Sequence, residues 1–409
     1  MPIEIRSITA DHTADFLRAM STPFAFDIED DEQETEVARF LDFFEPERAR
    51  CAFDGDRMIG TLGSFSFGMT VPGGEVPCAG TTMVTVQPTH RRRGILRSLI
   101  AAHFDDARER GEPIAALYAS DSAIYGRFGY GLASLDARME IGRPHVQLHR
   151  LAADPYPVRA VTVGEAETVF PRLFDRLRAE RPGMFRRTTG WWSARRFHDP
   201  QRHREGFTAQ RLAVADGPDG PAGYVQYRLK EGWVDHHGAH TVRVREIVAL
   251  EPGAAAGLWQ LVLNHDLASK VELFGLAIDD PVFDLMAGWR RAAPTLVDQL
   301  WVRILDVTAA LAARRYATDG SVTFAVHDPW TGATSTHRLT VKDGIGACQP
   351  SSDHPDVELD VEDLGACYLG RSRFRALNRA GRVTGGPDAL AAADAMFAWE
   401  PAPWCQEVF

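Results

Sequence analysis

The sequence predicts an α+β fold, with helices and strands mixed along a chain of several domains. Three observations carry this prediction. The chain has 409 residues, which is more than one ordinary hydrophobic core accommodates. Two long segments share the order strand, strand, turn, helix, and a third is rich in short alternating apolar runs. We therefore expect domains over residues 1–150, 151–293 and 294–409.

The first segment contains a strand–turn–helix–strand unit. We expect strands at 58–67, 82–86 and 114–120, with a helix at 95–107 between the last two. Apolar residues recur along this helix at helical spacing and form one face for burial, namely Ile95, Leu96, Leu99, Ile100, Phe104 and Ala107.

The second segment repeats this order with a different turn. We expect strands at 222–229 and 242–250 and an amphipathic helix at 258–267. The turn before the helix reads EPGAAAG at residues 251–257 and has no cation, whereas the first segment reads QPTHRRRG at residues 87–94. We interpret the pair as an ancestral duplication in which one copy has lost an anion site.

The third segment is expected to form one short helix and a strand-rich layer. The helix is expected at 307–316, and the dipeptide Asp343-Gly344, just after an apolar run, is typical of a hairpin turn. The expected strands are 300–305, 321–327, 336–341 and 357–361.

The composition disfavours several classes of function. Lys and Arg number 45 against 56 Asp and Glu, and this net charge of −11 argues against a nucleic-acid partner, which needs clustered cations. The five cysteines are scattered without a C-x-x-C pair, which argues for a reducing compartment. Residues 1–16 lack an apolar signal core, and no run approaches the roughly 20 apolar residues of a membrane span. We therefore expect a cytoplasmic protein with no membrane partner.

No metal site is expected. His236, His237 and His240 lie in a Gly-containing turn between strands, where they lack an ordered scaffold for a metal ion. The cysteines offer no zinc-binding spacing either.

The arginine-rich turn is the strongest chemical signal. It leads from a strand into a helix, whose first N–H groups and dipole favour an anion. Arg91, Arg92, Arg93 and Arg97 add guanidinium groups suited to phosphate, and Gly94 allows close approach of the backbone. The alternative is a solvated basic helix start, which the ordered unit around the turn disfavours.

Two motifs in this region resemble those of a known superfamily. The run MVTVQPTHRRRGIL at residues 83–96 resembles the acetyl-CoA motif of the GNAT N-acetyltransferases, whose general form is Q/R-x-x-G-x-G/A. The run IYGRFGY at residues 124–130 resembles the Y-x-x-x-G-F/Y segment of the same superfamily. The match departs at Leu96, where most members have Gly or Ala, so we expect a differently shaped end of the pyrophosphate loop.

The whole chain is more similar to one branch, the Eis (enhanced intracellular survival) acetyltransferases. The runs WVRILDV at 301–307 and LAARRY at 311–316 resemble the start of that family's third domain, and the aromatic C-terminal residue Phe409 also fits. The resemblance implies two tandem GNAT-like domains, the second without a cofactor site, and then a sterol-carrier-protein-like α/β domain ending in a docked C-terminus. It implies acetylation, with acetyl-CoA as co-substrate, of amines on aminoglycosides, polyamines or lysines, and a homo-oligomer, typically a hexamer.

The resemblance also assigns a donor site residue by residue. Backbone groups of one strand would pair with the pantetheine amides, the following turn would hold the pyrophosphate, and the end of the next strand would line the mouth. The alternative for the strand residues is that they only pack the core. Both roles are compatible, because the backbone binds the donor while the side chains are buried. The matching positions are Val84, Thr85 and Val86 on the strand, Arg91, Arg92, Arg93, Gly94, Ile95, Leu96 and Arg97 on the turn and helix start, and Ser120 and Asp121 at the mouth.

Two residues map onto catalytic positions of the family. Tyr125 maps onto the proton donor to the leaving thiolate, and the alternative is a ring packed under the cofactor loop. Phe409 maps onto the residue whose terminal carboxylate is the general base; a frayed tail is the alternative, which the apolar ending disfavours. A carboxylate of pKa ~3.5 and an ammonium of pKa ~10.4 differ by about 9 kcal/mol in proton-transfer free energy. The carboxylate would therefore need an amine of lowered pKa, act through water, or chiefly orient the amine.

The sequence leaves several acceptors open. A polycationic amine calls for an acidic pocket, and an early acidic run could supply it or could be a solvated face: Asp27, Glu29, Asp30, Asp31, Glu32, Glu34 and Glu36. Two further hypotheses stay open. One is a non-catalytic carrier that binds a lipid or small molecule in the third domain, and the other is an enzyme that acetylates protein lysines.

Overall fold

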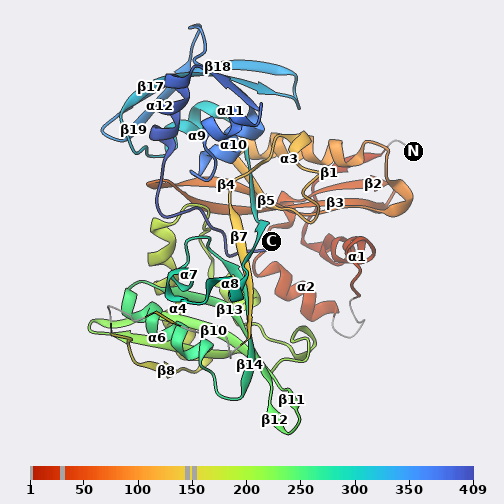
Figure 1. The fold of residues 1–409 in the computed structure, drawn as a ribbon. Helices are drawn as coiled ribbons and strands as arrows, with labels where there is room; N and C mark the ends of the chain where they lie inside the picture. Colours follow the sequence, from red (N-terminus) through yellow and green to blue (C-terminus); the bar gives the residue numbers. More distant parts are fainter. Residues whose placement is uncertain (1–2, 28–32, 143–147, 150–153) are drawn as a thin grey trace. The chain divides into compact units, whose positions relative to one another are not determined.

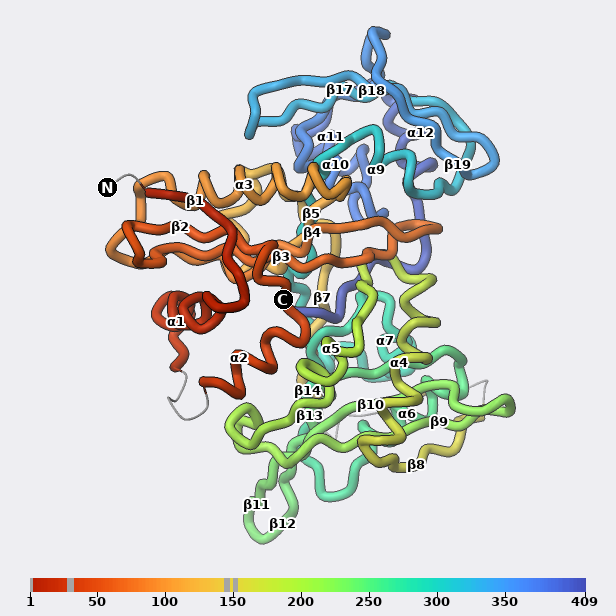
Figure 2. The backbone as a smooth tube through the Cα atoms, turned by 180° about the vertical axis from the view of Figure 1, so that it is seen from behind, coloured from red at the N-terminus to blue at the C-terminus, as the bar shows by residue number. Residues whose placement is uncertain are grey.

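The computed structural model describes residues 3–27, 33–142, 148–149 and 154–409. The chain forms two compact units, each with mixed helices and strands, so the predicted α+β fold is confirmed (Figures 1 and 2). The first unit comprises Met1–Ser134, Gln299–Glu400 and Glu407–Phe409, and the second comprises Leu135–Asp298 and Pro401–Gln406.

The first unit is built on a seven-stranded sheet of order β1-β2-β3-β4-β5-β16-β6. Strands β4 and β5 are parallel and the other neighbours are antiparallel. The strands are β1 Glu4–Arg6, β2 Arg50–Asp54, β3 Arg57–Val71, β4 Gly74–Val86, β5 Ile114–Tyr118, β6 Gly131–Leu132 and β16 Leu300–Ile304.

Helices cover both faces of this sheet. Helix α3 (Ile95–Glu109) lies on one face, and α1 (Thr13–Phe24) and α2 (Gln33–Leu41) lie on the other (Figures 1 and 2). Every residue of the apolar face predicted for α3 lies in or against the core on its side of the sheet. On the opposite face, aromatic rings of α1, β3 and the segment after α2 pack together, among them Phe16, Phe44 and Phe65.

The first unit also contains the predicted third domain, a five-stranded sheet of order β19-β18-β17-β20-β21 with helices α9 to α12. The Asp343-Gly344 hairpin is confirmed: it joins β18 to β19, and both residues have positive φ, 53° and 72°. The elements are α9 Val307–Ala313, β17 Gly320–Asp328, β18 Ala333–Lys342, β19 Ile345–Pro350, β20 Val357–Asp360, α10 Val361–Tyr368, α11 Phe374–Arg379, β21 Val383–Gly385 and α12 Pro387–Phe397.

The second unit has its own seven-stranded sheet of order β15-β7-β14-β13-β10-β9-β8, with β13 and β14 parallel. Its strands are β7 Leu135–Gly142, β8 Val158–Ala160, β9 Arg211–Gly217, β10 Gly220–Lys230, β13 His240–Ala249, β14 Ala268–Leu276 and β15 Thr295–Asp298, with a separate hairpin of β11 Trp233–Val234 and β12 His237–Gly238. Its helices are α4 Val163–Glu180, α5 Thr189–Trp191, α6 Pro252–Leu263, α7 Pro281–Leu285 and α8 Trp289–Ala292, with a π-helical turn at Trp192–Phe197.

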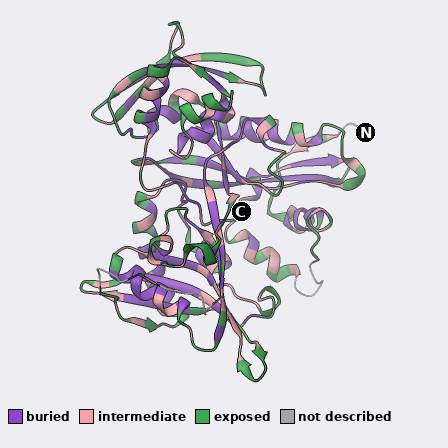
Figure 3. Cartoon of the chain, viewed as in Figure 1, coloured by how far each residue is buried: buried purple, intermediate pink, exposed green. Residues whose placement is uncertain are grey.

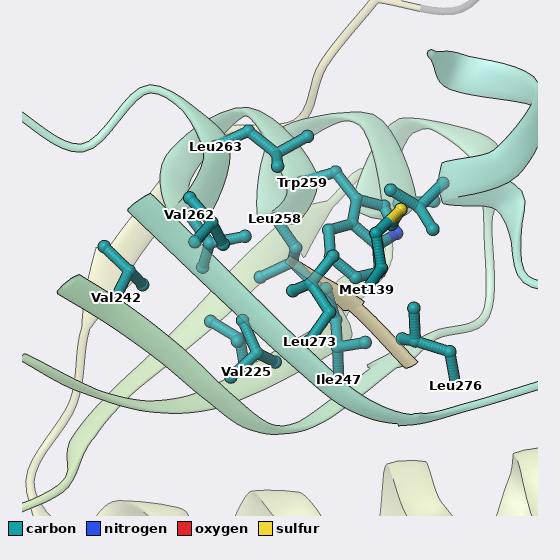
Figure 4. Packing of buried hydrophobic residues seen from close by; sticks show 14 of the residues in the cluster. Met139, Val225, Val242, Ile247, Leu258, Trp259, Val262, Leu263, Leu273 and Leu276 are labelled. Carbon is teal, nitrogen blue, oxygen red and sulfur yellow. The ribbon is translucent and has the colours of Figure 1, made fainter. Parts of the chain in front are cut away.

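The shared order of elements predicted for the first two segments is confirmed, although the second helix spans Pro252–Leu263 and not 258–267, so most of the expected turn belongs to the helix. The unit β3–β4–α3–β5 of the first sheet corresponds to β10–β13–α6–β14 of the second. In the second unit α6 packs Leu258 and Trp259 onto β10, β13 and β14 (Figure 4). Figure 3 shows that buried residues follow the strands of the two seven-stranded sheets, whereas the β11–β12 hairpin is largely exposed, as expected for sheets that share an apolar face with a covering layer.

The membership of the strands in the sheets differs from the domain boundaries expected at residues 150 and 293. Strand β7, within the expected first domain, pairs with β14 and β15, and its Met139 belongs to the second unit's core (Figure 4). Strand β16, expected to open the third domain, inserts between β5 and β6 of the first sheet. A strand's own pattern indicates that it is buried but does not say which edge it joins, and this is why the sequence placed both strands with their chain neighbours.

The second unit contains a buried ion cluster around Glu246. Arg187 donates two hydrogen bonds to its carboxylate, at 3.1 and 2.6 Å, and Arg196 and the hydroxyl of Tyr224 also donate to it. Burial alone would raise the pKa of Glu246, but the two guanidinium groups lower it to about 2.

We expect Glu246→Gln to lower the free energy of unfolding by about 3–5 kcal/mol, because the buried guanidinium of Arg187 and the largely covered guanidinium of Arg196 lose their counter-charge. The pKa of Glu246 is lower in the folded state, so its contribution is fully present above about pH 4.5 and is lost as the pH falls through 2. Urea unfolding at pH 7 tests the first part, with the exposed pair partner Glu165→Gln as control, for which about 1 kcal/mol or less is expected. Equal losses in the two variants would contradict the prediction.

Candidate functional site

A bulge in β4 marks the centre of the candidate site. Along the β3–β4 ladder, Thr61 pairs with Thr85 and Gly63 pairs with Thr82, so two residues of β4 oppose one of β3. Met83 in the bulge has φ +52°, an uncommon conformation for a residue with a side chain. The hydroxyl of Thr61 donates to the Met83 carbonyl at 2.7 Å, which satisfies a polar group that the bulge removes from the ladder.

Beyond this bulge, β4 separates from its parallel neighbour β5. Their registered pairs run from Cys78 opposite Ile114 to Gly80 opposite Ala116, and later residues of these two fully described strands do not pair with each other. Backbone groups of β4 near Val84 and Val86 are therefore left for a partner other than β5.

The arginine turn follows directly and leads into α3. Arg92 and Gly94 both have positive φ, 64° and 80°, and Gly94 is the N-cap residue of the helix. No side chain caps the helix, so its first N–H groups remain available to an anion. A Cβ at Gly94 would meet nothing within 4 Å, so the space in front of the helix start is open.

A pocket of about 650 Å³ lies between the separated strands, the turn and the segment after β5. All the residues predicted to bind the donor line it except Arg93 and Asp121. Arg93 contacts the Thr89 carbonyl at 3.4 Å, and the Asp121 carboxylate accepts a hydrogen bond from the Ala123 N–H at 3.0 Å. Local sequence reasoning missed the pocket residues Pro23, Phe24, His90, Ile124, Arg127 and Phe128.

Some of these pocket residues lie in a recognisable motif, and others have no local sequence feature that indicates a pocket. Arg127 and Phe128 belong to the quoted run at 124–130, so their place beside Tyr125 could have been read from the motif. Pro23 and Phe24 end helix α1, about 60 residues before the turn, and nothing in their own sequence points to the pocket.

Tyr125 also lines the pocket, and its environment keeps its phenol protonated. The residue is 6 % exposed, and its ring lies edge-on to Tyr130 with centroids 6.0 Å apart. Burial, and then the negative charge of Asp121, raise the pKa of Tyr125 to about 12. At physiological pH the hydroxyl can therefore donate a proton but carries no negative charge.

Behind Tyr125 lies a buried polar cluster that supports the sheet. The Thr81 hydroxyl is 2.8 Å from the Tyr130 hydroxyl and 2.7 Å from Nε2 of His103 on α3. Burial lowers the pKa of His103 to about 3, so this imidazole is neutral. The cluster ties β4, α3 and the segment after β5 together just before the bulge.

Phe409 packs on the first sheet, on the face opposite to the one that α3 covers. Its ring lies 5.1 Å from that of Phe67 and 6.4 Å from that of Phe65, both edge-on. Gly80 makes room for this aromatic group, because a Cβ there would come within 2.4 Å of the Phe67 ring. Figure 1 shows the C-terminus on the α1/α2 side of the sheet, where Glu407 is buried as well.

The comparisons with known proteins agree with this geometry. Two acetyltransferase (GNAT) domain families match residues 4–133 and 183–304, and a sterol carrier protein domain family matches 307–406. The N-acetyltransferase Eis of Mycobacterium tuberculosis is 32 % identical over 388 residues, covering 88 % of this chain and 92 % of that protein. The chain belongs to the Eis family of GNAT N-acetyltransferases.

Two further proteins match most of the chain. An uncharacterized N-acetyltransferase of Streptomyces avermitilis is 38 % identical over 372 residues, covering 89 % of this chain and 90 % of that protein. The crystal structure of Eis1 from Mycobacterium abscessus superposes with a TM-score of 0.84 at 29 % identity, covering 99 % of this chain and 100 % of that one. The predicted resemblance and the arrangement of two GNAT domains before a sterol-carrier-like domain are therefore confirmed.

GNAT domains use acetyl-CoA, and the residues of the first GNAT domain fit it. The separated β4 has free backbone groups for amides, and the start of α3 combines free N–H groups, positive φ and guanidinium groups for phosphates.

The corresponding place in the second GNAT domain is filled by protein. Tyr156 packs against the first two turns of α6, where a Cβ at Gly253 or Gly257 would come within 2.4 Å of its atoms. Its hydroxyl donates to the Glu251 carboxylate at 2.7 Å. This helix start therefore lacks both the cations and the open space found at α3.

The acidic run, metal-binding clusters and membrane-spanning helices were also considered in the sequence, and the structure gives the following for each. Glu29, Asp30, Asp31 and Glu32 of the acidic run lie outside the described residues, and Asp27 and Glu34 are exposed. In the part of the chain that the structure describes, no three His, Cys, Asp or Glu side chains gather as metal ligands would. None of the helices in the described ranges has the length and apolar character required to cross a membrane.

Proposed function

We propose that this protein transfers the acetyl group of acetyl-CoA to primary amines of aminoglycoside- or polyamine-like molecules, or of lysine side chains. The observation that carries the proposal is the pocket in which a bulged, separated β4 meets the arginine-bearing start of α3. Only the first GNAT domain would hold the donor, since Tyr156 fills the equivalent place in the second. From the family resemblance we also propose that the protein is cytoplasmic and forms a homohexamer. Light scattering, which measures the mass of the assembly, tests the hexamer.

In this proposal each part of the pocket holds one part of the donor, which supplies an acetyl thioester. Val84, Thr85 and Val86 present β4 backbone groups to the pantetheine amides. The N–H groups of Ile95 to Arg97 and the guanidinium groups of Arg91, Arg92 and Arg97 face the pyrophosphate. Ser120 and Tyr125 lie at the end of the pocket beyond β5.

Tyr125 is the proposed proton donor to the sulfur that leaves. A raised pKa of about 12 keeps the phenol protonated at working pH, and the largely apolar surroundings exclude water that would compete for the sulfur. A phenol of pKa about 12 is a weaker acid than a thiol, whose ordinary pKa is about 8.5, so this transfer needs a thiolate that burial in the same pocket makes more basic.

The terminal carboxylate of Phe409 is the proposed base. Its ring is anchored on β3, so the carboxylate is held near the sheet rather than in a frayed tail. The mismatch of about seven pKa units between carboxylate and ammonium remains, so we propose that it accepts the proton through water or from an amine whose pKa is lowered by its neighbouring cations.

A single added glycine after Phe409 separates the role of the ring from that of the carboxylate. It leaves the ring in place and moves the terminal charge by ~3.8 Å. We expect kcat to fall about 10- to 100-fold at pH 7 with the KM for acetyl-CoA unchanged, and the deficit to shrink towards pH 9–10, where more amine is already deprotonated. Val408→Ala, at an exposed neighbour, is the control. An unchanged kcat would remove Phe409 from the mechanism.

The carrier alternative finds little support in the third domain. A second pocket of about 530 Å³ lies where that domain meets α3 and β16, but charged side chains line it, which opposes an apolar ligand: Arg108, Glu112, Arg303, Asp306 and Asp328. The discriminating experiment measures thiol release from acetyl-CoA with a panel of aminoglycosides, polyamines and lysine peptides, together with CoA binding by calorimetry. Absence of both would reject the enzyme in favour of the carrier.

A further inference from the structure

The turn between β17 and β18 of the sterol-carrier-like domain reaches the core beneath the donor pocket. The indole of Trp330 in this turn lies edge-on to Phe104 and Phe128, with ring centroids 6.1 and 5.2 Å apart. It also lies under Arg97, whose guanidinium carbon is 4.4 Å from the indole centroid. Arg97 and Phe128 both line the donor pocket, whereas Trp330 itself does not.

One ion pair and two hydrogen bonds from backbone N–H groups fix where this indole lies. Arg303 on β16 is 1 % exposed, and its Nη2 donates to the Asp328 carboxylate at 2.5 Å. The other carboxylate oxygen accepts from the Trp330 N–H at 3.1 Å, and the Asp328 carbonyl accepts from the Gly332 N–H at 2.8 Å. The turn is therefore attached to the first sheet by a buried guanidinium group, and the indole is held by the turn.

The contact with Trp330 is the one interaction that orients Arg97 among the residues described. Arg97 is exposed and lies in the first turn of α3, and its guanidinium makes no hydrogen bond or ion pair with the described residues. A guanidinium that lies over an aromatic face is held by attraction to the ring and not by a hydrogen bond, so its five N–H groups stay available to other acceptors. This contact therefore reduces the freedom of the side chain without using the donors that a phosphate would need.

We propose that Trp330 is a positioning residue for the acyl donor, holding Arg97 towards the phosphate groups of a CoA thioester. This inference rests on the proposed function. It makes the sterol-carrier-like domain part of the donor site, because one of its turns organises a phosphate-binding side chain of the GNAT domain within the same compact unit.

The test compares Trp330→Leu, which keeps apolar packing but removes the aromatic face, with Trp330→Phe, which keeps a face. We expect Trp330→Leu to raise the KM for acetyl-CoA, and the calorimetric Kd for CoA, about two- to fivefold with kcat unchanged. Trp330→Phe should stay near wild type. The exposed Trp233→Leu in the second unit is the matched control and should change neither constant.

A double-substitution cycle separates positioning from general structural damage. Arg97→Ala alone should raise the Kd for CoA about tenfold, as loss of a charge-assisted contact does. If Trp330 acts through Arg97, adding Trp330→Leu to Arg97→Ala raises Kd no further. An equal additional rise in that background, or an unchanged Kd for Trp330→Leu alone, would overturn the proposal.

Two further readouts complete the design. Thermal unfolding identifies a variant that fails to fold. If Trp330→Leu fails, Asp328→Asn replaces it, because this substitution weakens the attachment of the turn but keeps the indole. The same two- to fivefold rise in the Kd for CoA is then expected. If the unaltered chain neither binds CoA nor releases thiol, the proposed function fails and takes this inference with it. If it binds CoA but is indifferent to Trp330 and Asp328, only the inference fails.

Discussion

Tyr125→Phe is expected to lower kcat for acetyl transfer by about a hundredfold or more, with little change in the KM for acetyl-CoA. The substitution removes one hydroxyl from a ring that packs against Tyr130 and lines the donor pocket, so the packing is retained. What is lost is the protonated oxygen that burial and Asp121 maintain, with a pKa of about 12.

The pH dependence gives this prediction a second readout. A phenol of pKa about 12 stays protonated up to about pH 11, so the wild-type rate should rise with pH as the amine loses its proton and should show no fall near pH 10. A decline centred on pH 10 would mean that the phenol titrates at its ordinary value and would contradict the assigned environment.

The matched control is Tyr156→Phe in the second GNAT domain. The hydroxyl of this tyrosine donates a hydrogen bond to the Glu251 carboxylate, and the residue lies at the helix start that has no cations. We expect kcat to be unchanged in Tyr156→Phe. Equal losses in the two variants, or full activity of Tyr125→Phe, would remove Tyr125 from the chemistry.

Gly94→Val is expected to raise the KM for acetyl-CoA by about tenfold or more while leaving the chain folded. Gly94 has φ +80° at the N-cap of α3, and the space that a side chain would enter is open. A branched side chain there would cover the first N–H groups of the helix, and a phosphate would lose one or more charge-assisted hydrogen bonds of about 1.5–3 kcal/mol each.

The same helix offers a control for backbone strain. Gly111 lies just beyond the other end of α3, with φ +72°, and a Cβ at this position would again meet nothing within 4 Å. Gly94→Val and Gly111→Val should each cost about 1–2 kcal/mol of stability, because both force a side chain into the left-handed region. Only Gly94→Val should change KM. A similar KM in both variants would contradict phosphate binding at this turn.

Much of the first GNAT domain could be predicted because its signals are local. The apolar spacing from Ile95 to Ala107 follows from the 3.6-residue period of a helix, and the structure has α3 over Ile95–Glu109. The dipeptide Asp343-Gly344 of the third domain predicts its hairpin for a similar reason, because few residues adopt positive φ without strain. The donor-site positions came from a motif whose residues are contiguous in the chain, so one turn brings most of them together.

The remaining features depend on partners far away in the sequence. The bulge at Met83 needs the Thr61 hydroxyl to donate to its carbonyl, and the insertion of β16 depends on the edge that β5 offers. Neither is visible in the strand itself. The domain boundaries expected at 150 and 293 differ from the observed sheets for the same reason.

The amino-acid sequence was sufficient for the α+β class, the duplicated strand–turn–helix unit, the arginine turn and the family, because each depends on backbone periodicity or on residues close in the chain. The folded structure was needed to find that Phe409 packs on Phe67, that Tyr156 fills the second copy, and that Trp330 lies under Arg97. These contacts join residues dozens to hundreds of positions apart. They form because burying aromatic surface is favourable wherever the folded sheets bring complementary side chains together. The local sequence pattern does not show which distant residues will meet.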